Sequence, residues 1–363
     1  MTTGSFKYET NTSVSEIATR LKNAKRVLIT THTKPDGDAM GCSVAMKRAL
    51  EQLGITADLW LAGPVERGIH ALSSGTPYHL IEEELPTEEY DVIVVVDTGA
   101  WTQLEPIRPW LEPQIQRVIC IDHHRRGDEI SAMRLIDPTA AACSEVLVRV
   151  LDAMGCKLTG GDAGIAEALF AGLATDTGWF KFSSAGASTF ALASRLMETG
   201  IDKPRLFRML EENSRPQRLA LEARALSSVR YGFEGKIAVM VLRPEDFEET
   251  GAETTDLTGM VNAPMVVGRV SVSIILTEAV PGKTKISFRS KPPAGAEQEM
   301  WFVDVNSLAA RFGGGGHRHA AGCQINDSID ASIGQLMEVL EISEFQKNPE
   351  RASVLPGEKS QKS

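Results

Sequence analysis

Short apolar runs that stop at a polar side chain recur in the first half of the chain. Arg26 to Thr31 is a β-rich run, and Val92 to Asp97 and Val118 to Asp122 are two further runs that end at an aspartate. Strands buried on both faces of a parallel sheet have such continuous apolar sequences. Because ligands of open α/β sheets bind beyond the carboxyl ends of the strands, we predict that Asp97 and Asp122 lie beside the loop after the first run.

Helical periodicity separates and follows these runs. The spacing of Ser13 and Glu16 predicts a capping box at the start of a helix that ends near Asn23. Residues 38–53 also have helical periodicity, with Gly54 placed as the residue that ends the helix. Helical patterns dominate from about residue 140 to residue 226. Within them we predict helices over 144–154, 162–174 and 188–199, with Gly155 and Gly200 ending two of these.

Strand patterns take over near Arg230. Residues 230–242 predict a hairpin around Glu234 and Gly235, and 267–278 and 283–290 predict two further strands. A chain of 363 residues exceeds the usual size of a single hydrophobic core, so two domains are expected. We predict a catalytic domain over 14–205, a helical linker over 206–228, a substrate-binding domain over 229–345 and a disordered tail over 346–363.

Composition narrows the class of protein. Hydrophobic residues (42%) and charged residues (24%) are those of a globular protein. The absence of an apolar run of about 18 residues, and of a signal peptide in the first residues, predicts a cytoplasmic protein without a membrane partner. The five cysteines never form a CxxC pair, so we expect buried apolar side chains. The net charge of -10 disfavours a track for long nucleic acid, but a small phosphorylated ligand could bind through a divalent metal.

Potential metal ligands gather after the apolar runs. His32, Asp36 and Asp38 fall within seven residues, and Asp97, Asp122, His123, His124 and Asp176 follow. Taken singly, Asp36 with Gly37 is typical of a turn, Asp97 could cap a helix, and paired histidines are common in polar loops. An unpaired charge at the end of a buried strand is costly, however. The set therefore favours imidazole and carboxylate ligands for two ions of the Mn²⁺ or Mg²⁺ kind.

A glycine run near the C-terminus is the second candidate site. Four consecutive glycines, 313–316, are by themselves typical of a flexible linker. Here they lie inside a domain, between a helical segment (305–311) and an apolar stretch, and His317, Arg318 and His319 follow directly. Backbone N–H groups of Gly315 and Gly316, together with these three side chains, could bind a phosphate.

The ordered set of motifs resembles the DHH phosphoesterase superfamily. His32-xxx-Asp36-x-Asp38 is similar to the first motif of that family, Asp97 to the second, Asp122-His123-His124 to the third and Asp176 to the fourth. Residues 313–322 resemble the GGGHxxAAG signature of the DHHA1 domain, and Arg289 in Ser-Phe-Arg-Ser resembles its Ser-x-Arg strand. The similarity extends over about residues 15 to 340.

This resemblance implies an α/β fold, in which a DHH domain with a mainly parallel sheet flanked by helices is followed, across a cleft, by a smaller α/β DHHA1 domain. It implies that His32 and Asp36 hold one Mn²⁺, that Asp38, His123 and Asp176 hold another, and that Asp97 bridges them. Asp122 and His124 would orient His123 and meet the substrate phosphate, which a hydroxide shared by the two ions attacks. Arg289, Gly315, Gly316, His317, Arg318 and His319 would bind the substrate.

Family members with this length and domain plan are of the nanoRNase and pAp-phosphatase type. They imply hydrolysis of short oligoribonucleotides or of 3'-phosphoadenosine 5'-phosphate. A cyclic di-AMP or pApA phosphodiesterase and a non-catalytic nucleotide sensor remain the alternatives, and a homodimer stays open. We assign no role to His70, His79 or Trp101. Trp179, Phe180 and Phe182 are typical of core, although one of them could line a nucleobase pocket.

Overall fold

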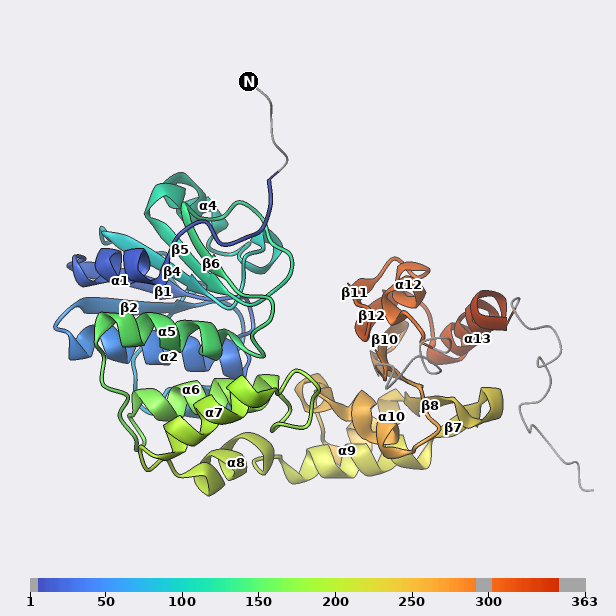
Figure 1. Cartoon of the computed structure of the whole chain (residues 1–363). Helices are drawn as coiled ribbons and strands as arrows, with labels where there is room; N and C mark the ends of the chain where they lie inside the picture. The colour runs from blue at the N-terminus through green and yellow to red at the C-terminus, as the bar shows by residue number, and fades with distance from the viewer. Residues whose placement is uncertain (1–5, 292–301, 346–363) are drawn as a thin grey trace, which may run out of the picture. The chain divides into compact units, whose positions relative to one another are not determined.

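The computed structural model describes residues 6–291 and 302–345, so the tail predicted over 346–363 lies outside the described residues. The chain divides into two compact units, Met1–Asn213 and Ser214–Ser363 (Figure 1). Two helices, α8 (Lys203–Glu211) and α9 (Pro216–Ser227), flank the division. No helix in the described part of the chain is long and apolar enough to cross a membrane.

The first unit is built on a six-stranded parallel sheet in the order β3-β2-β1-β4-β5-β6. The predicted parallel sheet is therefore confirmed, and the three apolar runs are β1, β4 and β5, three of its four inner strands. β1 pairs with β4, and at this place the strand order reverses direction. The strands are β1 (Arg26–Thr30), β2 (Thr56–Leu61), β3 (His79–Leu80), β4 (Val92–Val96), β5 (Val118–Asp122) and β6 (Met133–Ile136).

Helices of the first unit begin and end largely where the sequence predicts. The capping box of Ser13 and Glu16 is formed, and Gly155 ends its helix in a left-handed conformation with a φ of 81°. One start is wrong: the helix expected from Asp162 begins at Ile165, because its N-cap is Gly164 and Gly161 is left-handed, with a φ of 88°. The remaining helices are α1 (Val14–Lys22), α2 (Gly37–Gln52), α3 (Arg67–Leu72), α4 (Arg108–Leu111), α5 (Cys143–Met154), α6 (Ile165–Asp176) and α7 (Ala187–Met197).

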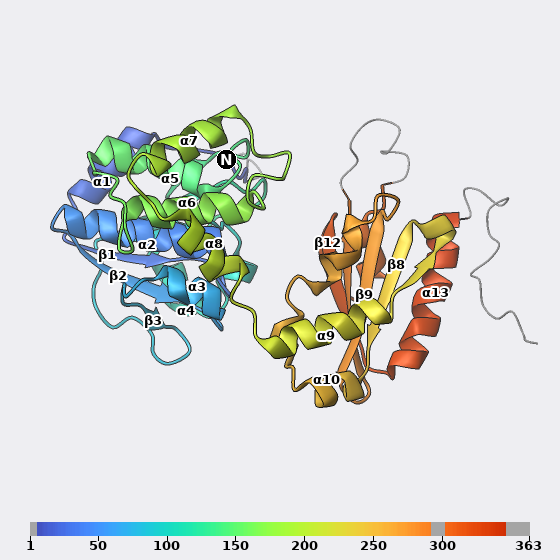
Figure 2. The ribbon, with the colours of Figure 1, turned by 90° about the horizontal axis from the view of Figure 1, so that it is seen from below.

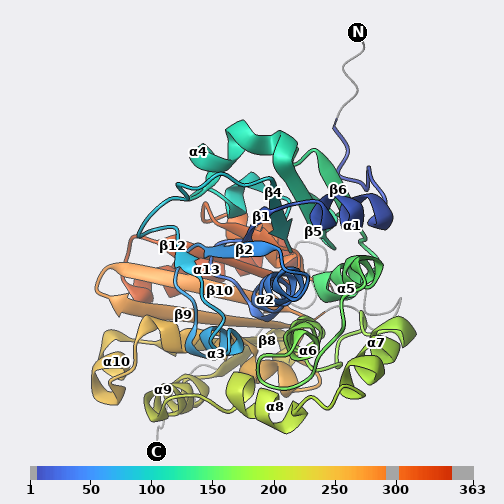
Figure 3. The same ribbon diagram turned by 90° about the vertical axis from the view of Figure 1, so that its left-hand side faces the viewer.

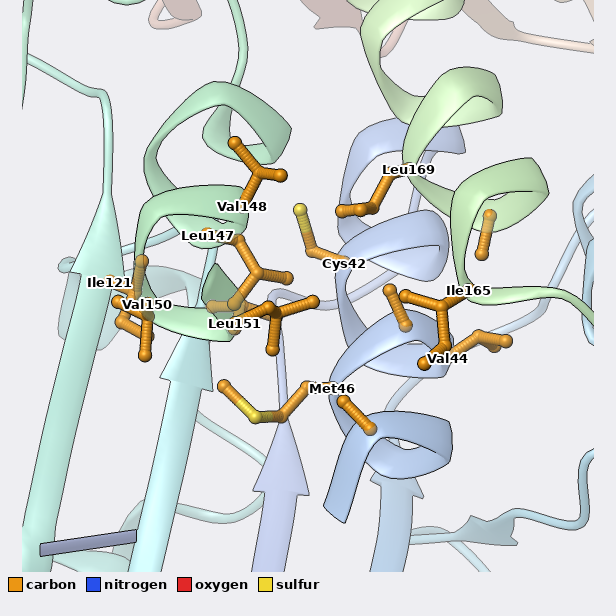
Figure 4. Close-up of a cluster of buried hydrophobic side chains, with 14 of the residues drawn as sticks. Cys42, Val44, Met46, Ile121, Leu147, Val148, Val150, Leu151, Ile165 and Leu169 are labelled. Atoms are coloured by element: carbon orange, nitrogen blue, oxygen red, sulfur yellow. The ribbon is translucent and has the colours of Figure 1, made fainter. Parts of the chain in front are cut away.

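Alternate side chains of the strands enter two separate cores. Val94 and Val96 belong to the core shared with α2, α5 and α6, whereas Ile93 and Val95 belong to a second core with Leu104 and Leu111. Figure 3 shows α4 on one side of the sheet and α2, α5 and α6 on the other. In Figure 4, apolar side chains of α2, α5 and α6 converge on one another. Each fully buried aliphatic side chain contributes about 1.5 to 3 kcal/mol of transfer free energy. This packing fixes α2 against the sheet and thereby sets the position of the loop before α2. All five cysteines are buried and free, as predicted.

The second unit is a mixed six-stranded sheet in the order β11-β12-β10-β9-β8-β7. Leu221 and Met240 belong to a core that includes residues of α9 and α10, and Phe288 and Leu336 to a core that includes residues of α12 and α13. Figure 2 shows α9 crossing the strands of this sheet and α13 beside β8. The bounds are β7 (Arg230–Gly232), β8 (Ile237–Leu242), β9 (Val272–Val280), β10 (Lys283–Ser290), β11 (Gly315–His317), β12 (Ala320–Ile325), α10 (Pro244–Thr250), α12 (Val305–Ala310) and α13 (Ile329–Phe345).

The glycine run is not a plain loop, which corrects the sequence interpretation. Gly315 and Gly316 lie in β11, an edge strand that pairs antiparallel with β12. A Cβ at Gly316 would overlap the backbone of Ala320 and Ala321, and its φ of 150° lies in a region that side chains rarely adopt. Glycine is therefore needed for close packing of the hairpin, and a flexible linker is excluded here.

Candidate metal centre

Three loops at the carboxyl edge of the parallel sheet carry the candidate ligands. His32 and Asp36 follow β1, Asp97 follows β4, and Asp122 ends β5 before the two histidines. β1 and β4 are neighbours at the point where the strand order reverses. Open α/β sheets bind their ligands at this point, beyond the carboxyl ends of the strands, and the loops that follow β1 and β4 begin there. The fold thus brings residues from distant parts of the sequence to one place.

The first group of ligand atoms is formed by His32, Asp36 and Asp97. Their ligand atoms all lie within 4.8 Å of one another. The Nε2 of His32 is 3.8 Å from the Oδ1 of Asp36 and 3.8 Å from the Oδ2 of Asp97. Asp36 is also the N-cap of α2, where its Oδ1 accepts hydrogen bonds from the N–H groups of Asp38 and Ala39. The start of α2 therefore fixes the carboxylate of Asp36.

The second group is formed by Asp38, His123 and Asp176, again with all ligand atoms within 4.8 Å of one another. The Nε2 of His123 lies 3.4 Å from the Oδ2 of Asp176 and 3.4 Å from the Oδ1 of Asp97. The other ring nitrogen, Nδ1, lies 3.3 Å from the carbonyl oxygen of Ala140, which orients the ring. Asp97 is thus within reach of both groups, one oxygen toward each histidine.

Asp38 is anchored from the opposite side by the start of α5. Its Oδ2 accepts a hydrogen bond from the N–H of Cys143, and its Oδ1 accepts hydrogen bonds from the N–H and the hydroxyl of Ser144. The N-cap residue of α5, Ala142, has no side chain that can cap the helix. The carboxylate of Asp38 therefore satisfies the first N–H groups of α5 from another element.

Asp97 combines backbone strain with an unpartnered oxygen. Its φ is 59°, in the left-handed region that few residues other than glycine, asparagine and aspartate adopt. Its side chain is only 3% exposed, and its buried Oδ1 accepts no hydrogen bond from the described residues. Buried carboxylate oxygens without a donor are rare and costly. A cation beside Oδ1 would remove this cost, and the oxygen and imidazole donor set suits Mn²⁺ or Mg²⁺.

The carboxylate of Asp122 organises the turn that follows β5. Asp122 is fully buried. Its Oδ1 accepts hydrogen bonds from the N–H of His123 at 2.7 Å, the N–H of His124 at 3.2 Å and the Nδ1 of His124 at 2.7 Å. Its Oδ2 accepts a 2.5 Å hydrogen bond from the hydroxyl of Tyr8. Sequence analysis missed Tyr8, because no local pattern links two residues that are 114 positions apart.

Crowding of carboxylates shifts the pKa values of the surrounding groups. Burial lowers the pKa of His32, but the negative charges of Asp36 and Asp97 beside the ring raise it to about 9. Burial lowers the pKa of His123 as well, but the negative charges of Asp97, Asp176 and Asp38 raise it to about 10. Each histidine is therefore held as a cation when no metal is bound.

The same crowding also raises the pKa values of two carboxylates, Asp176 and Asp97. Burial and the charge of Asp38 raise the pKa of Asp176 to about 7. Burial, followed by the charge of Asp38, also raises the pKa of Asp97 well above its usual value. Four carboxylates (Asp36, Asp38, Asp97 and Asp176) thus face two imidazoles within the described residues. A bound cation would favour the ionised form of all four, which is the electrostatic character of a cation site.

The second unit brings Arg289 next to the hairpin of β11 and β12. Arg289 pairs with Ala320, and the N–H of Ser290 donates to the carbonyl oxygen of His319 at 3.0 Å. Burial lowers the pKa of Arg289. Its guanidinium donates to the carbonyl oxygen of Phe288, and no carboxylate of the described residues lies within 4.0 Å of it. A half-buried arginine without an acidic partner is a candidate anion site.

The side chains after β11 surround one aromatic ring. The guanidinium of Arg318 lies 4.7 Å from the ring centroid of Phe302, and the ring of His319 lies 4.8 Å from it. Arg318 also approaches Asp304, with 3.6 Å between Nε and Oδ2. The side chain of His317 lies outside the described residues. Arg318 and His319 therefore share a surface with Phe302, a residue that sequence analysis did not assign.

The residues left without a role have other partners. His70 hydrogen-bonds to Tyr78, and His79 lies beside Glu84, whereas Trp101 is covered by Arg108. Trp179 and Phe180 pack against the core of the first unit. Phe182, six residues after Asp176, is 58% exposed and is therefore not a core residue, unlike the other two members of this trio.

Each of the two units matches a known protein-family model. A family model described as "DHH family, N-terminal domain" matches residues 26–173, and one described as "DHHA1 domain" matches residues 234–344. The chain is 31% identical to the bifunctional oligoribonuclease and PAP phosphatase NrnA of Thermus thermophilus, across 86% of this chain and 89% of that protein. It is 26% identical to the probable bifunctional oligoribonuclease and PAP phosphatase NrnA of Streptococcus mutans, across 86% and 93%.

A solved structure has the same fold. The exopolyphosphatase-related protein from Bacteroides fragilis superposes with a TM-score of 0.81 at 24% identity, over 90% of this chain and 95% of that one.

Proposed function

This chain belongs to the DHH family and carries a DHHA1 domain, and from that premise we propose that it hydrolyses short oligoribonucleotides, 3'-phosphoadenosine 5'-phosphate, or both. One observation carries the proposal. Asp97 belongs to the group of ligand atoms around His32 and to a further group with His123 and His124, and its Oδ1 lies 3.4 Å from the Nε2 of His123. The relatives named as oligoribonuclease and PAP phosphatase support the choice of substrate.

The residues that would hold metal follow from the two groups. His32 and Asp36 would bind one ion, Asp38, His123 and Asp176 a second, and Asp97 both. Divalent cations such as Mn²⁺ supply Lewis-acid activation of a phosphoryl oxygen and lower the pKa of water. The first unit itself supplies a rigid frame, because α2, α5 and β5 fix Asp36, Asp38 and the histidine turn by backbone hydrogen bonds.

His124 would hold the reacting phosphate. Its Nδ1 is bound by Asp122, whose hydrogen bond and charge raise the pKa of His124. The opposite nitrogen, Nε2, has no hydrogen-bond partner among the described residues, and the side chain is 48% exposed. A protonated Nε2 donates to a phosphoryl oxygen and offsets the negative charge that develops on it. Asp122 would keep the ring in this orientation.

The second unit would bind a further phosphate of the substrate. Arg289 is half-buried without an acidic partner in the described part of the chain, and it lies beside the hairpin that carries Arg318 and His319. We include Gly315, Gly316 and His317 in this binding region because β11 is an edge strand, whose outer N–H groups remain open to an anion. Two phosphates bound by two sets of residues would favour short substrates.

Parallel product analysis tests the proposal. The full chain with Mn²⁺ is incubated with pAp, di- to pentaribonucleotides, pApA and cyclic di-AMP, and the products are separated by chromatography. We expect turnover of pAp or of the shortest ribonucleotides to exceed that of cyclic di-AMP. The Asp97→Asn variant, purified in the same way, controls for contaminating nucleases.

The rival functions give different results in the same assay. Preferred cleavage of cyclic di-AMP or pApA would replace the proposed substrate by that of a cyclic dinucleotide phosphodiesterase. Thermal stabilisation by nucleotides without turnover of any of them, or of a generic phosphodiester, would indicate a nucleotide sensor.

A further inference from the structure

The segment that precedes α1 lies along β6, the edge strand of the parallel sheet. The N–H of Asn11 donates to the carbonyl oxygen of Arg134 at 3.0 Å, and the N–H of Arg134 donates to the Oδ1 of Asn11 at 2.7 Å. The hydroxyl of Thr10 hydrogen-bonds to both the N–H and the carbonyl oxygen of Ile136, at 2.8 Å each. These contacts fix the position of the segment that brings Tyr8 next to Asp122.

The ring of Tyr8 fits between two loops that carry candidate site residues. A Cβ at Gly99, in the loop after Asp97, would overlap the hydroxyl of Tyr8. A Cβ at Gly127, in the loop after the histidine turn, would overlap the ring. The same loops are joined by a 2.7 Å hydrogen bond from the N–H of Asp128 to the carbonyl oxygen of Gly99. Both loops therefore leave room for one aromatic side chain from elsewhere.

The hydroxyl of Tyr8 donates a hydrogen bond to the buried carboxylate of Asp122. The Oδ1 of Asp122 accepts its three hydrogen bonds from the histidine turn. The Oδ2 accepts only the hydroxyl of Tyr8 among the described residues, at 2.5 Å. Burial raises the pKa of Tyr8, with further contributions from Cys120 and Asp122, so the hydroxyl stays protonated and can donate. Without it, Oδ2 would be a buried acceptor with no donor, which is costly.

We propose that Tyr8 is a positioning residue of the active site, which holds Asp122 so that Asp122 in turn holds the ring of His124 toward the reacting phosphate. The proposal rests on the proposed function, because it takes His124 as the group that meets phosphate. It goes beyond the metal ligands, since Tyr8 touches neither group of ligand atoms. Tyr8, which belongs to none of the sequence motifs, would thereby set the orientation of the His124 ring in the turn after β5.

Two variants separate positioning from simple packing. Tyr8→Phe keeps the ring between the two loops and removes only the hydroxyl. Thr10→Val removes the hydrogen bonds to Ile136, but the two hydrogen bonds between Asn11 and Arg134 still hold the segment on β6, and the contact of Tyr8 with Asp122 is left in place. For Tyr8→Phe we expect kcat to fall about tenfold, with KM and the number of bound Mn²⁺ ions unchanged. For Thr10→Val we expect a lower Tm and a kcat within about twofold of the parent chain.

A double-mutant cycle tests whether Tyr8 acts through Asp122. In the Asp122→Ala background, Tyr8→Phe should have no further effect on kcat, because the carboxylate that it positions is gone. Full additivity of the two substitutions would overturn the proposal. A loss of Mn²⁺ from Tyr8→Phe, or a fall in kcat that Thr10→Val matches at equal loss of Tm, would overturn it as well.

A readout without turnover keeps this test distinct from that of the proposed function. ¹⁵N NMR of the imidazoles in the metal-free chain reports the hydrogen bond at the Nδ1 of His124, with His124→Gln to assign the signals. Tyr8→Phe should shift the signals of His124 and leave those of His79 unchanged. Unchanged His124 signals would refute positioning by Tyr8, even if the chain hydrolyses nucleotides. Shifted signals in a chain that hydrolyses none would instead refute the proposed function and leave the positioning of His124 in place.

Discussion

Asp38 caps α5 by accepting a 3.2 Å hydrogen bond from the backbone N–H of Ser144 and a second one from the hydroxyl of the same residue. A candidate metal ligand in the first turn of one helix thus serves as the cap of another. The helix dipole of α5 stabilises the negative charge of Asp38 in a site where burial and other carboxylates oppose it. Fold stability and metal affinity are therefore linked at this contact.

Ser144→Ala should weaken metal binding more than catalysis. The substitution removes the hydroxyl that donates to Asp38 and leaves the backbone N–H in place. A lost hydrogen bond to a charged group costs about 1.5 to 3 kcal/mol, so we expect a Kd for Mn²⁺ raised by about tenfold or more. Isothermal titration calorimetry measures it, and kcat at saturating Mn²⁺ should recover to near the parent value. An unchanged Kd would show that Ser144 serves α5 alone.

Asp97→Asn should abolish turnover and reduce bound manganese toward zero. Asparagine tolerates the left-handed backbone of this position, so the fold should persist while the shared charge is lost. Asp91→Asn is the matched control, because Asp91 lies directly before β4, at the amino end of the strand that Asp97 follows. Its carboxylate accepts hydrogen bonds from the N–H groups of Lys25 and Arg26. The control should keep its activity. Mass spectrometry measures the bound manganese. An Asp97→Asn variant that keeps its manganese and turns over substrate at a near-normal rate would contradict the shared-ligand proposal.

The metal-free protein should lose stability as the pH rises. The pKa values of His32 (about 9) and His123 (about 10) exceed the unfolded value of 6.5, and that of Asp176 (about 7) exceeds 3.8. A group with a raised folded pKa stabilises the fold below its unfolded pKa, and this contribution is lost as pH rises through the folded value.

Mn²⁺ should reverse this trend, because it binds the unprotonated ligands. We expect the Tm of the metal-free chain to fall between pH 6 and pH 9, and the increase in Tm caused by Mn²⁺ to grow over the same range. Differential scanning calorimetry with and without chelator measures both. A Mn²⁺-induced shift that shrinks toward pH 9 would speak against these ligands.

Arg289→Ala should raise KM for nucleotides by about tenfold or more, in line with the 1.5 to 3 kcal/mol expected for a lost charged hydrogen bond. Turnover of a small generic phosphodiester, which lacks a second phosphate, should change little. Lys283→Ala offers a control on the same strand, since Lys283 is exposed at the other end of β10. Equal loss on nucleotides and on the generic ester would show that Arg289 supports the fold rather than the substrate.

Substrate length should be penalised. The net charge of -10 disfavours the additional phosphates of a long strand. We expect kcat/KM to fall by at least about tenfold, or roughly 1.4 kcal/mol, between a diribonucleotide and a twenty-nucleotide RNA at equal salt. Comparable rates, or degradation of the long RNA without intermediates, would favour an exonuclease that follows long strands.

The sequence predicts those parts of the molecule whose signals are local. β4 and β5 are recognisable because a strand covered on both faces must be apolar throughout, and an aspartate at its end is conspicuous. The start of α6 was misplaced because Gly161 and Gly164 interrupt a helical pattern by backbone conformation. β2 and β6 were not predicted, since short strands carry little periodicity.

Long-range contacts account for what remained hidden in the site. Tyr8 reaches Asp122 only because its segment follows β6, and that pairing depends on the order of the whole sheet. The left-handed backbone of Asp97 has no signal in the sequence either, because aspartate is common at strand ends in ordinary conformations. That Gly315 and Gly316 form part of a strand could not be predicted either, because close packing against β12 is a property of the second unit's sheet.

The contact of Tyr8 with Asp122 also constrains how the chain can fold during translation. The two residues are 114 positions apart, so at about 5 to 20 residues per second Tyr8 leaves the ribosome on the order of 10 s before its partner has been synthesised. Closing so long a loop is entropically unfavourable until β6 offers its backbone. The first described residues of the chain leave the ribosome early but cannot dock until β6 has been synthesised, and the turn after β5 lacks the hydroxyl of Tyr8 until then.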